Sequence, residues 1–259
     1  MKDEIVYDQH FMVDPEVIQF IIKEAGLNKK DIVLEIGPGE GYLTEELVKK
    51  AGKVIAIEID EKFIELLEKI PHLKLVFGNA LEILPLRNDF NKIVANIPYQ
   101  ICEPLMHYLC SAKKVELSVL TMPMRFARKV QEHPVFSAFL KVEILKEVPK
   151  ESFSPQPRVY SAVVRIVLNK DESDELFIIR KLYWQRTKKL KNGLRDALID
   201  LAESKGKKVS KKEALGLIEK MGFEDQILEM LIARLPLETY GKIESKIRKK
   251  GMFSEENKI

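Results

Sequence analysis

The sequence has few of the residues on which disulfide-bonded or metal-bound folds depend. Its 259 residues include only two cysteines, Cys102 and Cys110, which lack a C-x-x-C spacing. We interpret them as two reduced, partly buried thiols rather than as a disulfide framework. The four histidines show no H-E-x-x-H or paired spacing. We therefore predict no metal site.

Long apolar runs are also missing. No run approaches ~18 apolar residues, and the first residues lack the apolar segment of an export signal. The sequence therefore predicts no membrane partner and a cytoplasmic location. The net charge is only +3, with 46% hydrophobic and 32% charged residues. This composition is typical of a packed globular protein, and the length allows one large domain with a smaller appendage.

Short β-rich runs alternate with helical patterns from about Val17 to Lys170. Asp14-Pro15 is typical of a helix start, with aspartate as the cap and proline as the first helical residue. The expected strands are 31–36, 53–59, 73–77, 92–95, 117–121, 141–148 and 162–168. Strands separated by helices predict an α/β fold with a parallel sheet and right-handed crossovers.

Four residues lie at or closely after the carboxyl ends of predicted strands: Gly37, Glu58, Asn79 and Asn96. Ligands of parallel α/β sheets bind at the carboxyl ends of the strands. We therefore expect these four residues to converge on one edge of the sheet.

The first of these residues opens a glycine-rich turn, Gly37-Pro38-Gly39-Glu40-Gly41. Glycines let a backbone approach a ligand where a Cβ would clash. A dinucleotide site needs open amides for its pyrophosphate, but Pro38 removes one N–H and Glu40 adds negative charge. The turn therefore favours a cationic, phosphate-free cofactor such as S-adenosylmethionine over NAD.

Glu58 and Asn79 suit the nucleoside part of such a cofactor. The carboxylate of Glu58 can accept hydrogen bonds from both ribose hydroxyls, and Asn79 can accept one from the adenine amino group. The alternative for each residue alone is a strand-end cap or turn former. For Asn79 in isolation that alternative is the better interpretation, but the ordered series of four favours a cofactor site.

Residues 96–99 read Asn96-Ile97-Pro98-Tyr99 after an apolar run. The Asn96 oxygen and a main-chain carbonyl near Ile97 or Pro98 can accept both N–H groups of a planar amine, which localises the lone pair of its nitrogen. Pro98 fixes the local backbone, and Tyr99 can stack on an extruded base. The pattern predicts methyl transfer to the amino group of an adenine. The alternative is a turn that closes a strand beside a core tyrosine.

The polar stretch 169–174 predicts a domain boundary, because the pattern beyond it is helical. Residues 180–212 contain twelve Lys or Arg and three Asp or Glu, a local excess of +9. Its candidates for RNA contact are Arg186, Lys188, Lys189, Lys191 and Arg195. A solvated helical face is the alternative. Tyr183 and Trp184 are more typical of helix packing than of an RNA platform.

At this point the chain resembles the KsgA-type family of ribosomal RNA adenine N6,N6-dimethyltransferases, including its archaeal branch. The resemblance extends over residues 9 to about 200 in the order of the family. Its motifs are Gln9-His10-Phe11-Met12-Val13-Asp14, Leu34-Glu35-Ile36-Gly37-Pro38-Gly39, Ile57-Glu58-Ile59-Asp60, Gly78-Asn79-Ala80, Asn96-Ile97-Pro98-Tyr99-Gln100-Ile101, Phe153-Ser154-Pro155-Gln156-Pro157-Arg158-Val159-Tyr160-Ser161-Ala162, and Arg186-Thr187-Lys188-Lys189 through Ala197-Leu198.

The resemblance implies a Rossmann-like S-adenosylmethionine-dependent methyltransferase sheet over 1–170 and a smaller helical domain over 175–259 that docks on RNA. It implies cofactor contacts at His10, Met12, Gly37, Gly39, Glu58, Asn79 and Asn96. It implies target-base contacts at Asn96, Ile97, Pro98, Tyr99 and Phe153, the last as a second stacking face. The expected substrate is two adjacent adenosines near the 3′ end of small-subunit ribosomal RNA on a pre-assembled particle, modified by a monomer.

The chain departs from the family in the loop over residues 121–137, which shapes the approach to the target base. Two further hypotheses follow from that departure. The first is an RNA-binding ribosome-assembly factor that has weak or lost turnover. The second is a methyltransferase for a different RNA adenine or for DNA adenine.

Overall fold

The computed structural model describes residues 9–250, with side chains as far as residue 248. The chain forms two compact units. One comprises residues 1–132 and 140–168, and the other comprises 133–139 and 169–259. The expected domains, 1–170 and 175–259, thus also include residues outside the described range at both ends. The segment 133–139 belongs to the second unit, although a single boundary near residue 170 leaves it in the first.

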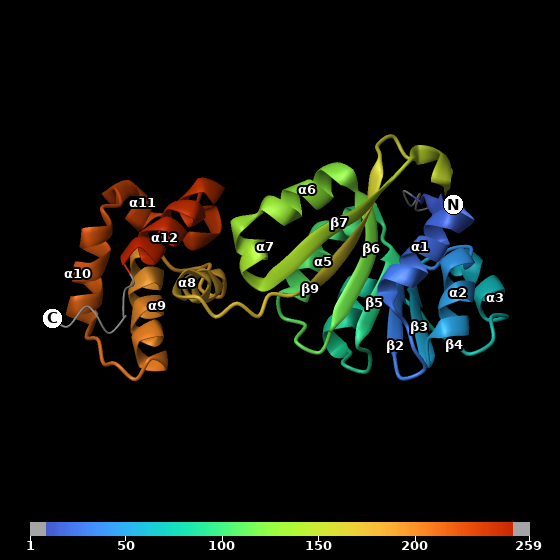
Figure 1. Cartoon of the computed structure of the whole chain (residues 1–259), viewed down its shortest axis with the longest axis horizontal. Coiled ribbons are helices and arrows are strands. Elements are labelled where there is room, and N and C mark those ends of the chain that lie inside the picture. Colours follow the sequence, from blue (N-terminus) through green and yellow to red (C-terminus); the bar gives the residue numbers. More distant parts are fainter. Residues whose placement is uncertain (1–8, 251–259) are drawn as a thin grey trace, which may run out of the picture. The chain divides into compact units, whose positions relative to one another are not determined.

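A seven-stranded sheet forms the centre of the first unit, in the order β4-β3-β2-β5-β6-β9-β7 (Figure 1). The strands are β2 (Ile32–Ile36), β3 (Lys53–Glu58), β4 (Leu73–Phe77), β5 (Lys92–Asn96), β6 (Leu117–Pro123), β7 (Leu140–Val148) and β9 (Ser161–Leu168). Every strand expected from the sequence is present, with ends that differ by at most two residues. The central strands β2, β3, β5 and β6 are largely buried, whereas the outer strands β4 and β7 carry exposed lysine or glutamate residues.

The expected parallel pairing is confirmed for the five strands from β4 to β6 and is wrong for β9. β9 runs antiparallel to both of its neighbours, β6 and β7. The chain between β7 and β9 contains only η4 (Lys150–Ser152) and β8 (Phe153–Ser154), without a crossover helix. A parallel return needs such a helix, so the strand folds back antiparallel.

The helices of the first unit are short. They are α1 (Pro15–Ala25), α2 (Tyr42–Lys50), η1 (Glu61–Phe63), α3 (Ile64–Leu67), α4 (Ala80–Ile83), η2 (Leu84–Leu86), η3 (Tyr99–Ile101), α5 (Cys102–Leu109) and α6 (Met124–Glu132). α1 begins as the sequence predicts, because the Asp14 side chain accepts hydrogen bonds from the amides of Glu16 and Val17 at 2.9 and 3.3 Å. A hydrogen bond from Ser152 to this carboxylate is the main reason why the pKa of Asp14 is lowered.

A two-stranded antiparallel sheet joins the start of the described chain to the segment before β9. β1 (Phe11–Met12) pairs with β8, so that Met12 lies opposite Phe153. Both side chains are buried in the same hydrophobic cluster as Val17 and Ile21 of α1. This pairing holds the chain around His10 and Phe11 in place beside the carboxyl edge of the large sheet.

The second unit is helical throughout its described part. Its elements are α7 (Pro134–Phe139), α8 (Asp174–Tyr183), α9 (Leu190–Ser204), α10 (Lys211–Met221), α11 (Asp225–Glu229), η5 (Ile232–Arg234) and α12 (Leu237–Lys250). α7 belongs here because the Phe139 ring contacts Tyr183 of α8 edge-on at 5.0 Å, and Arg180 donates to the Ala138 carbonyl at 2.7 Å. None of the helices in the described part of the chain has the length and apolarity that a membrane crossing requires.

Candidate active site

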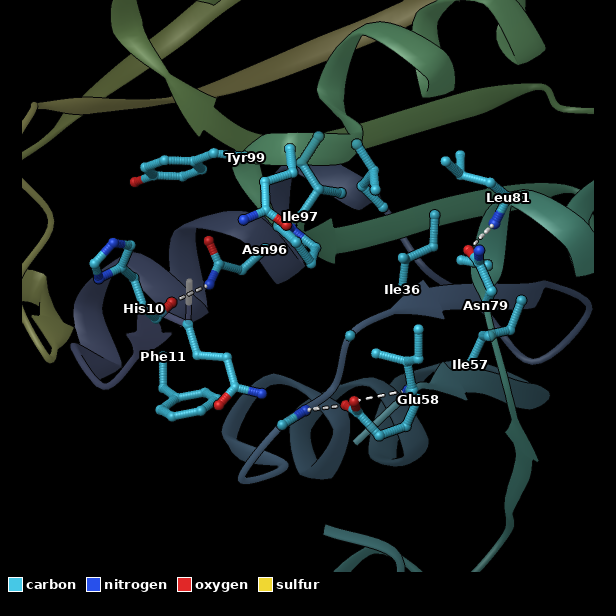
Figure 2. Close-up of a pocket in the computed structure, with 18 of the residues that line it drawn as sticks. His10, Phe11, Ile36, Ile57, Glu58, Asn79, Leu81, Asn96, Ile97 and Tyr99 are labelled. Atoms are coloured by element: carbon cyan, nitrogen blue, oxygen red, sulfur yellow. Dashed lines mark hydrogen bonds between the residues drawn. The ribbon is translucent and has the colours of Figure 1, made fainter. Parts of the chain in front are cut away.

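The carboxyl ends of four strands surround a cavity of about 240 Å³ in the first unit (Figure 2). Gly37, Glu58, Asn79 and Asn96 all line it, so the four strand-end positions converge as the sequence predicts. The other lining residues are Gln9, His10, Phe11, Ile36, Gly39, Ile57, Ile59, Gly78, Ala80, Leu81, Ile97, Pro98, Tyr99, Gln100 and Ile101. The wall is mainly apolar, with a few polar groups at fixed places, as is usual for a small-molecule site.

The glycine turn after β2 can be built only from glycine at its centre. Gly37 and Gly39 have φ values of +66° and +53°, which L side chains rarely adopt. A Cβ on Gly39 would lie 2.6 Å from the Phe11 ring. The turn therefore brings main chain, rather than side chain, against the cavity wall.

The buried carboxylate of Glu58 fixes this turn to the end of β3. Its Oε2 accepts a hydrogen bond from the Gly39 amide at 3.0 Å, and its Oε1 accepts from the amides of Ile59 and Asp60 at 2.8 and 2.9 Å. Each carboxylate oxygen can accept more than one hydrogen bond, so Glu58 retains acceptor capacity toward the cavity that it lines.

Asn79 lines the cavity and also caps a helix. Its Oδ1 accepts a hydrogen bond from the Leu81 amide at 3.0 Å at the start of α4 (Figure 2). Its side-chain amide donates to Glu82 at 3.1 Å. The cap that the sequence left open as an alternative is therefore present, and it holds the Asn79 amide at the cavity wall.

The side chain of Asn96, the last residue of β5, uses its nitrogen in a hydrogen bond but not its oxygen. Its Nδ2 donates to the main-chain carbonyl of His10 at 2.8 Å, whereas its Oδ1 is buried and accepts no hydrogen bond from any described residue. A carbonyl can only accept, so the nitrogen must face His10 and the oxygen must face away. Figure 2 shows the oxygen turned toward the side of the cavity where Tyr99 lies. A ligand that donates a hydrogen bond can satisfy it.

The two main-chain carbonyls after Asn96 differ in their partners. The Pro98 carbonyl accepts from the Ile101 amide at 3.1 Å and lies 3.9 Å from the Cys102 thiol. The Ile97 amide donates to Thr121 at 3.2 Å, but its carbonyl accepts no hydrogen bond from the described residues. Of the two carbonyls named by the sequence, that of Ile97 is therefore the one with free acceptor capacity.

The Tyr99 side chain is held at both ends. Its hydroxyl and the Ser161 hydroxyl are 2.6 Å apart, and its ring lies 5.6 Å from the His10 ring with a tilt of 42°. The Nδ1 of His10 is in turn 2.9 Å from the Pro155 carbonyl. His10 thus lines the cavity, positions Asn96 through its carbonyl and flanks Tyr99 with its ring.

Met12 and Phe153 are not brought to the cavity. Their side chains are only 4% and 2% exposed and belong to the hydrophobic core. A ring buried to this degree has no free face on which a base can stack. The structure gives both side chains a packing role in the β1–β8 pair, and the contacts with a ligand that the family resemblance implies for these residues stay a prediction.

Several cavity residues had no functional prediction, although they lie in or next to the predicted motifs. Phe11, Ile36 and Ile57 form apolar walls, and Leu81 follows the Asn79 cap. Ile36 and Ile57 could have been found from the sequence, because they directly precede the strand-end residues Gly37 and Glu58. Gln9 donates a hydrogen bond to Asp60 at 2.8 Å, but it does not neighbour a strand-end residue in the sequence, so this pattern could not have identified it.

Glu35 lies directly before the last residue of β2 and is buried. Burial raises its pKa to about 8, and the nearby carboxylate of Glu58 adds to the effect. Its Oε2 has no hydrogen-bond partner among the described residues. The residues that the structure describes contain no group of three or more His, Cys, Asp or Glu able to hold a metal ion.

The five predicted RNA contacts lie in the second unit, and three of them already have acidic partners. Lys188 and Arg195 both bind Asp196, at 2.8 and 2.7 Å, and Lys189 binds Glu229 at 2.6 Å. The guanidinium of Arg186 lies 5.8 Å from the centre of the Tyr183 ring. Tyr183 is buried, as expected for helix packing, whereas Trp184 is 59% exposed.

A Rossmann-like sheet with a glycine turn after β2, a buried carboxylate ending β3 and an Asn-Ile-Pro-Tyr segment after β5 defines an S-adenosylmethionine-dependent methyltransferase. Residues 2–227 match the family "Ribosomal RNA adenine dimethylase". The chain belongs to this family.

Two archaeal relatives illustrate the match, and both are named "Probable ribosomal RNA small subunit methyltransferase A". The protein of Methanopyrus kandleri is 36% identical over 207 residues, which cover 72% of this chain and 74% of that protein. The protein of Thermococcus gammatolerans is 38% identical over 196 residues, which cover 67% and 69%.

Two solved structures resemble the fold over almost its full length. The dimethyladenosine transferase of Plasmodium falciparum has a TM-score of 0.60 and 27% identity, and the match covers 93% of this chain and 98% of that one. The 23S rRNA methyltransferase ErmE has a TM-score of 0.58 with 21% identity, and covers 92% and 99%. The latter likeness concerns the fold alone.

Proposed function

We propose that this protein transfers methyl groups from S-adenosylmethionine to N6 of adenosines in small-subunit ribosomal RNA. The observation that carries the proposal is the buried Asn96 oxygen, which faces a cavity beside Tyr99 and has no hydrogen-bond donor among the described residues. A planar amine supplies the donor that this oxygen lacks. The names of the archaeal relatives support small-subunit ribosomal RNA as the source of that amine.

The cavity fits S-adenosylmethionine as the cofactor. The wall next to the glycine turn is main chain, in a place where a Cβ on Gly39 would collide with Phe11. Glu58 would bind the ribose hydroxyls with its remaining acceptor capacity, and Asn79 would lie against the adenine. Pro38 and Glu40 disfavour a phosphate-bearing cofactor. When bound, S-adenosylmethionine supplies an electrophilic methyl group on a sulfonium.

The chain itself prepares the nucleophile. An exocyclic aromatic amine is weakly nucleophilic because its lone pair is delocalised into the ring. Asn96 Oδ1 accepts one N–H hydrogen bond and the Ile97 carbonyl accepts the other, which keeps the lone pair on nitrogen. Both acceptors are fixed. The Asn96 side chain donates a hydrogen bond to the His10 carbonyl, and the Ile97 amide donates one to the Thr121 carbonyl. Most of the acceleration then comes from alignment rather than from a strong base.

Tyr99 holds the face of the base while Asn96 holds its edge. Base–aromatic stacking contributes roughly 1–3 kcal/mol per base. The hydroxyl bond to Ser161 and the neighbouring His10 ring fix the Tyr99 ring before the base arrives. A base extruded from its stack can thus bind between Tyr99 and Asn96 without first reorienting these side chains.

We further propose that the product is N6,N6-dimethyladenosine at two adjacent adenosines of a pre-assembled small subunit, made by a cytoplasmic monomer. The helical unit would dock on the particle. Arg186 and Lys191 carry no ion pair among the described residues and would contact RNA directly. Lys188, Lys189 and Arg195 would first exchange their carboxylate partners for phosphates.

Mass spectrometry of nucleosides tests this function. Small subunits from a strain that lacks the modification are incubated with the protein and S-adenosylmethionine, and their RNA is digested. We expect dimethyladenosine at two neighbouring positions. Binding to the particle without any methyl incorporation would support an assembly factor instead, and methylation of naked duplex DNA but not of the particle would support a DNA enzyme.

A further inference from the structure

An exposed aromatic residue and several cations lie together at the carboxyl edge of the sheet, outside the cavity. Arg125 and Arg128 come from α6, and Lys150, Arg158 and Tyr160 come from the connection between β7 and β9. We call these five residues the rim surface. Figure 1 shows α6 and this connection at the same edge of the sheet, where β6 and β7 end and β9 begins.

Tyr160 is a fixed platform rather than a loose surface side chain. Its carbonyl accepts a hydrogen bond from the Met124 amide at 3.0 Å, and its neighbour Ser161 pairs with Pro123 in the β6–β9 ladder. The Nζ of Lys150 lies 5.5 Å from the centre of its ring. The ring nevertheless stays 51% exposed. One face is therefore supported by a cation while part of the ring remains open to a ligand.

The platform is joined directly to the target-base slot. Ser161, which follows Tyr160, shares the 2.6 Å hydroxyl contact with Tyr99. Tyr160 directly precedes the residue that holds Tyr99, so both tyrosines are attached to the start of β9.

The charges of the rim surface are available for a ligand. Arg125, Arg128 and Arg158 are exposed and form no ion pair with the described residues. Two acidic residues lie near this surface. Glu103 is 4.0 Å from Lys129, and exposed Glu151 follows Lys150 in the sequence. The four cations of the rim surface outnumber these two carboxylates, so its net charge is positive. It contrasts with the second unit, where three of the five predicted RNA contacts are paired with carboxylates.

We propose that the rim surface binds the single-stranded RNA that flanks the target adenosine. A neighbouring base stacks on Tyr160, and backbone phosphates contact Arg125, Arg128 and Arg158. Stacking on a π-face combined with cations along the backbone is how proteins hold single strands without reading their sequence. This inference rests on the proposed function, because it assumes RNA as the substrate.

The test uses the full-length chain, small ribosomal subunits that lack the modification, and three readouts. These are the KM and kcat for dimethylation, the affinity for subunits at two salt concentrations, and the affinity for S-adenosylmethionine by calorimetry. For Tyr160→Ala we expect KM to rise roughly 5- to 100-fold, with little change in kcat. Tyr160→Phe, which keeps the ring, should behave like the wild type.

The charge contribution has its own matched control. Arg125→Glu/Arg158→Glu should weaken subunit binding and flatten its salt dependence, because each lost phosphate contact removes about 0.7 from the logarithmic slope for a single strand. Lys30→Glu/Lys74→Glu reverses two exposed lysines that form no ion pair with described residues. This control should leave the slope near that of the wild type. Calorimetry should show unchanged cofactor affinity in every variant.

The outcomes separate this inference from the function on which it rests. If the wild-type chain dimethylates subunits but Tyr160→Ala has an unchanged KM, the rim surface does not hold the flanking strand and the function stands. The same conclusion follows if both double variants change the salt slope equally. If the wild-type chain leaves the adenosines unmodified, the proposed function fails and this inference fails with it.

Discussion

Two groups of buried polar side chains, one at each edge of the central sheet, differ in how their hydrogen bonds are satisfied. At the amino edge, the Lys92 ammonium donates to two main-chain carbonyls at the end of α1, at 3.1 and 3.0 Å, and to Asp31 at 3.0 Å. At the carboxyl edge, side-chain oxygens of Asn96 and Glu35 are equally buried but have no partner among the described residues.

Buried polar groups with partners inside the chain stabilise the fold, whereas a buried group without a partner is available to bind a ligand. A buried polar group left without a hydrogen bond costs roughly 1–3 kcal/mol, so a fold keeps one only where something else satisfies it. The cluster of Lys92 and Asp31 at the amino edge is complete within the chain itself. Under the proposed function, the target amine supplies the hydrogen bond that Asn96 lacks at the carboxyl edge.

Breaking the amino edge should have the largest effect on stability. In Lys92→Ala, the buried Asp31 carboxylate loses its ammonium partner, and we expect the free energy of unfolding of the sheet to fall by about 3–5 kcal/mol. Urea unfolding followed by far-UV circular dichroism measures this change. Lys53→Ala, which removes an exposed lysine at the start of β3, is the control. Equal stability of the two variants would refute the role of the amino edge.

The pH dependence of stability should reveal the incomplete carboxyl edge. The pKa of Glu35 is about 8 in the folded protein, against an ordinary value of 4.5, because the carboxyl group is buried. The folded state therefore holds this proton more tightly than the unfolded state, and stability should fall as pH rises from about 4.5 to 8. Melting temperatures of the wild type and Glu35→Gln across this range test the sign. The decline should be clearly smaller in the variant, and identical profiles would contradict the assignment.

A smaller effect is expected at the glycine turn. Gly39→Ala places a Cβ against Phe11 at a φ of +53°, and such strain costs about 1–3 kcal/mol. We expect affinity for S-adenosylmethionine, measured by calorimetry, to fall roughly 5- to 100-fold. Gly222→Ala has a similar φ of +64° but open space around the added Cβ. It should leave cofactor affinity unchanged, and a matching loss in both variants would exclude a local effect at the turn.

Much of the fold could be predicted from the sequence because local patterns determine it. The apolar runs predict the ends of the strands to within two residues, and the Asp14 cap of α1 lies where the Asp-Pro pair predicts it. The direction of β9 was missed because it depends on what the chain between β7 and β9 lacks, namely a crossover helix. The place of α7 in the second unit depends on contacts with α8, which leave no local pattern.

The candidate site divides in the same way. The strand-end series from Gly37 to Asn96 could be predicted, because parallel topology alone brings those positions together. Met12 and Phe153 lie in a motif shared with the family, but a motif does not show which side chains of a segment point inward. The pairing of β1 with β8 buries both of them. The bond from Asn96 to the His10 carbonyl links distant segments, so only the structure could reveal it.

The most direct measurement compares two asparagines on opposite edges of the sheet. Asn91 at the amino edge accepts a hydrogen bond from the Ile32 amide at 2.9 Å and donates to Asp31 at 3.0 Å, whereas the Asn96 oxygen has no partner among the described residues. For each alanine variant, the single-turnover rate of dimethyladenosine formation and the melting temperature are determined on the same preparation. Asn96→Ala should lose roughly 100-fold or more in rate, as for a lost transition-state hydrogen-bonding group. Its melting temperature should fall less than that of Asn91→Ala, because it loses only the hydrogen bond to the His10 carbonyl.

Asn91→Ala should show the reverse, a lower melting temperature with a normal rate per folded molecule. Dimethyladenosine formation at the wild-type rate in Asn96→Ala would contradict the central claim that this unsatisfied oxygen holds the target amine.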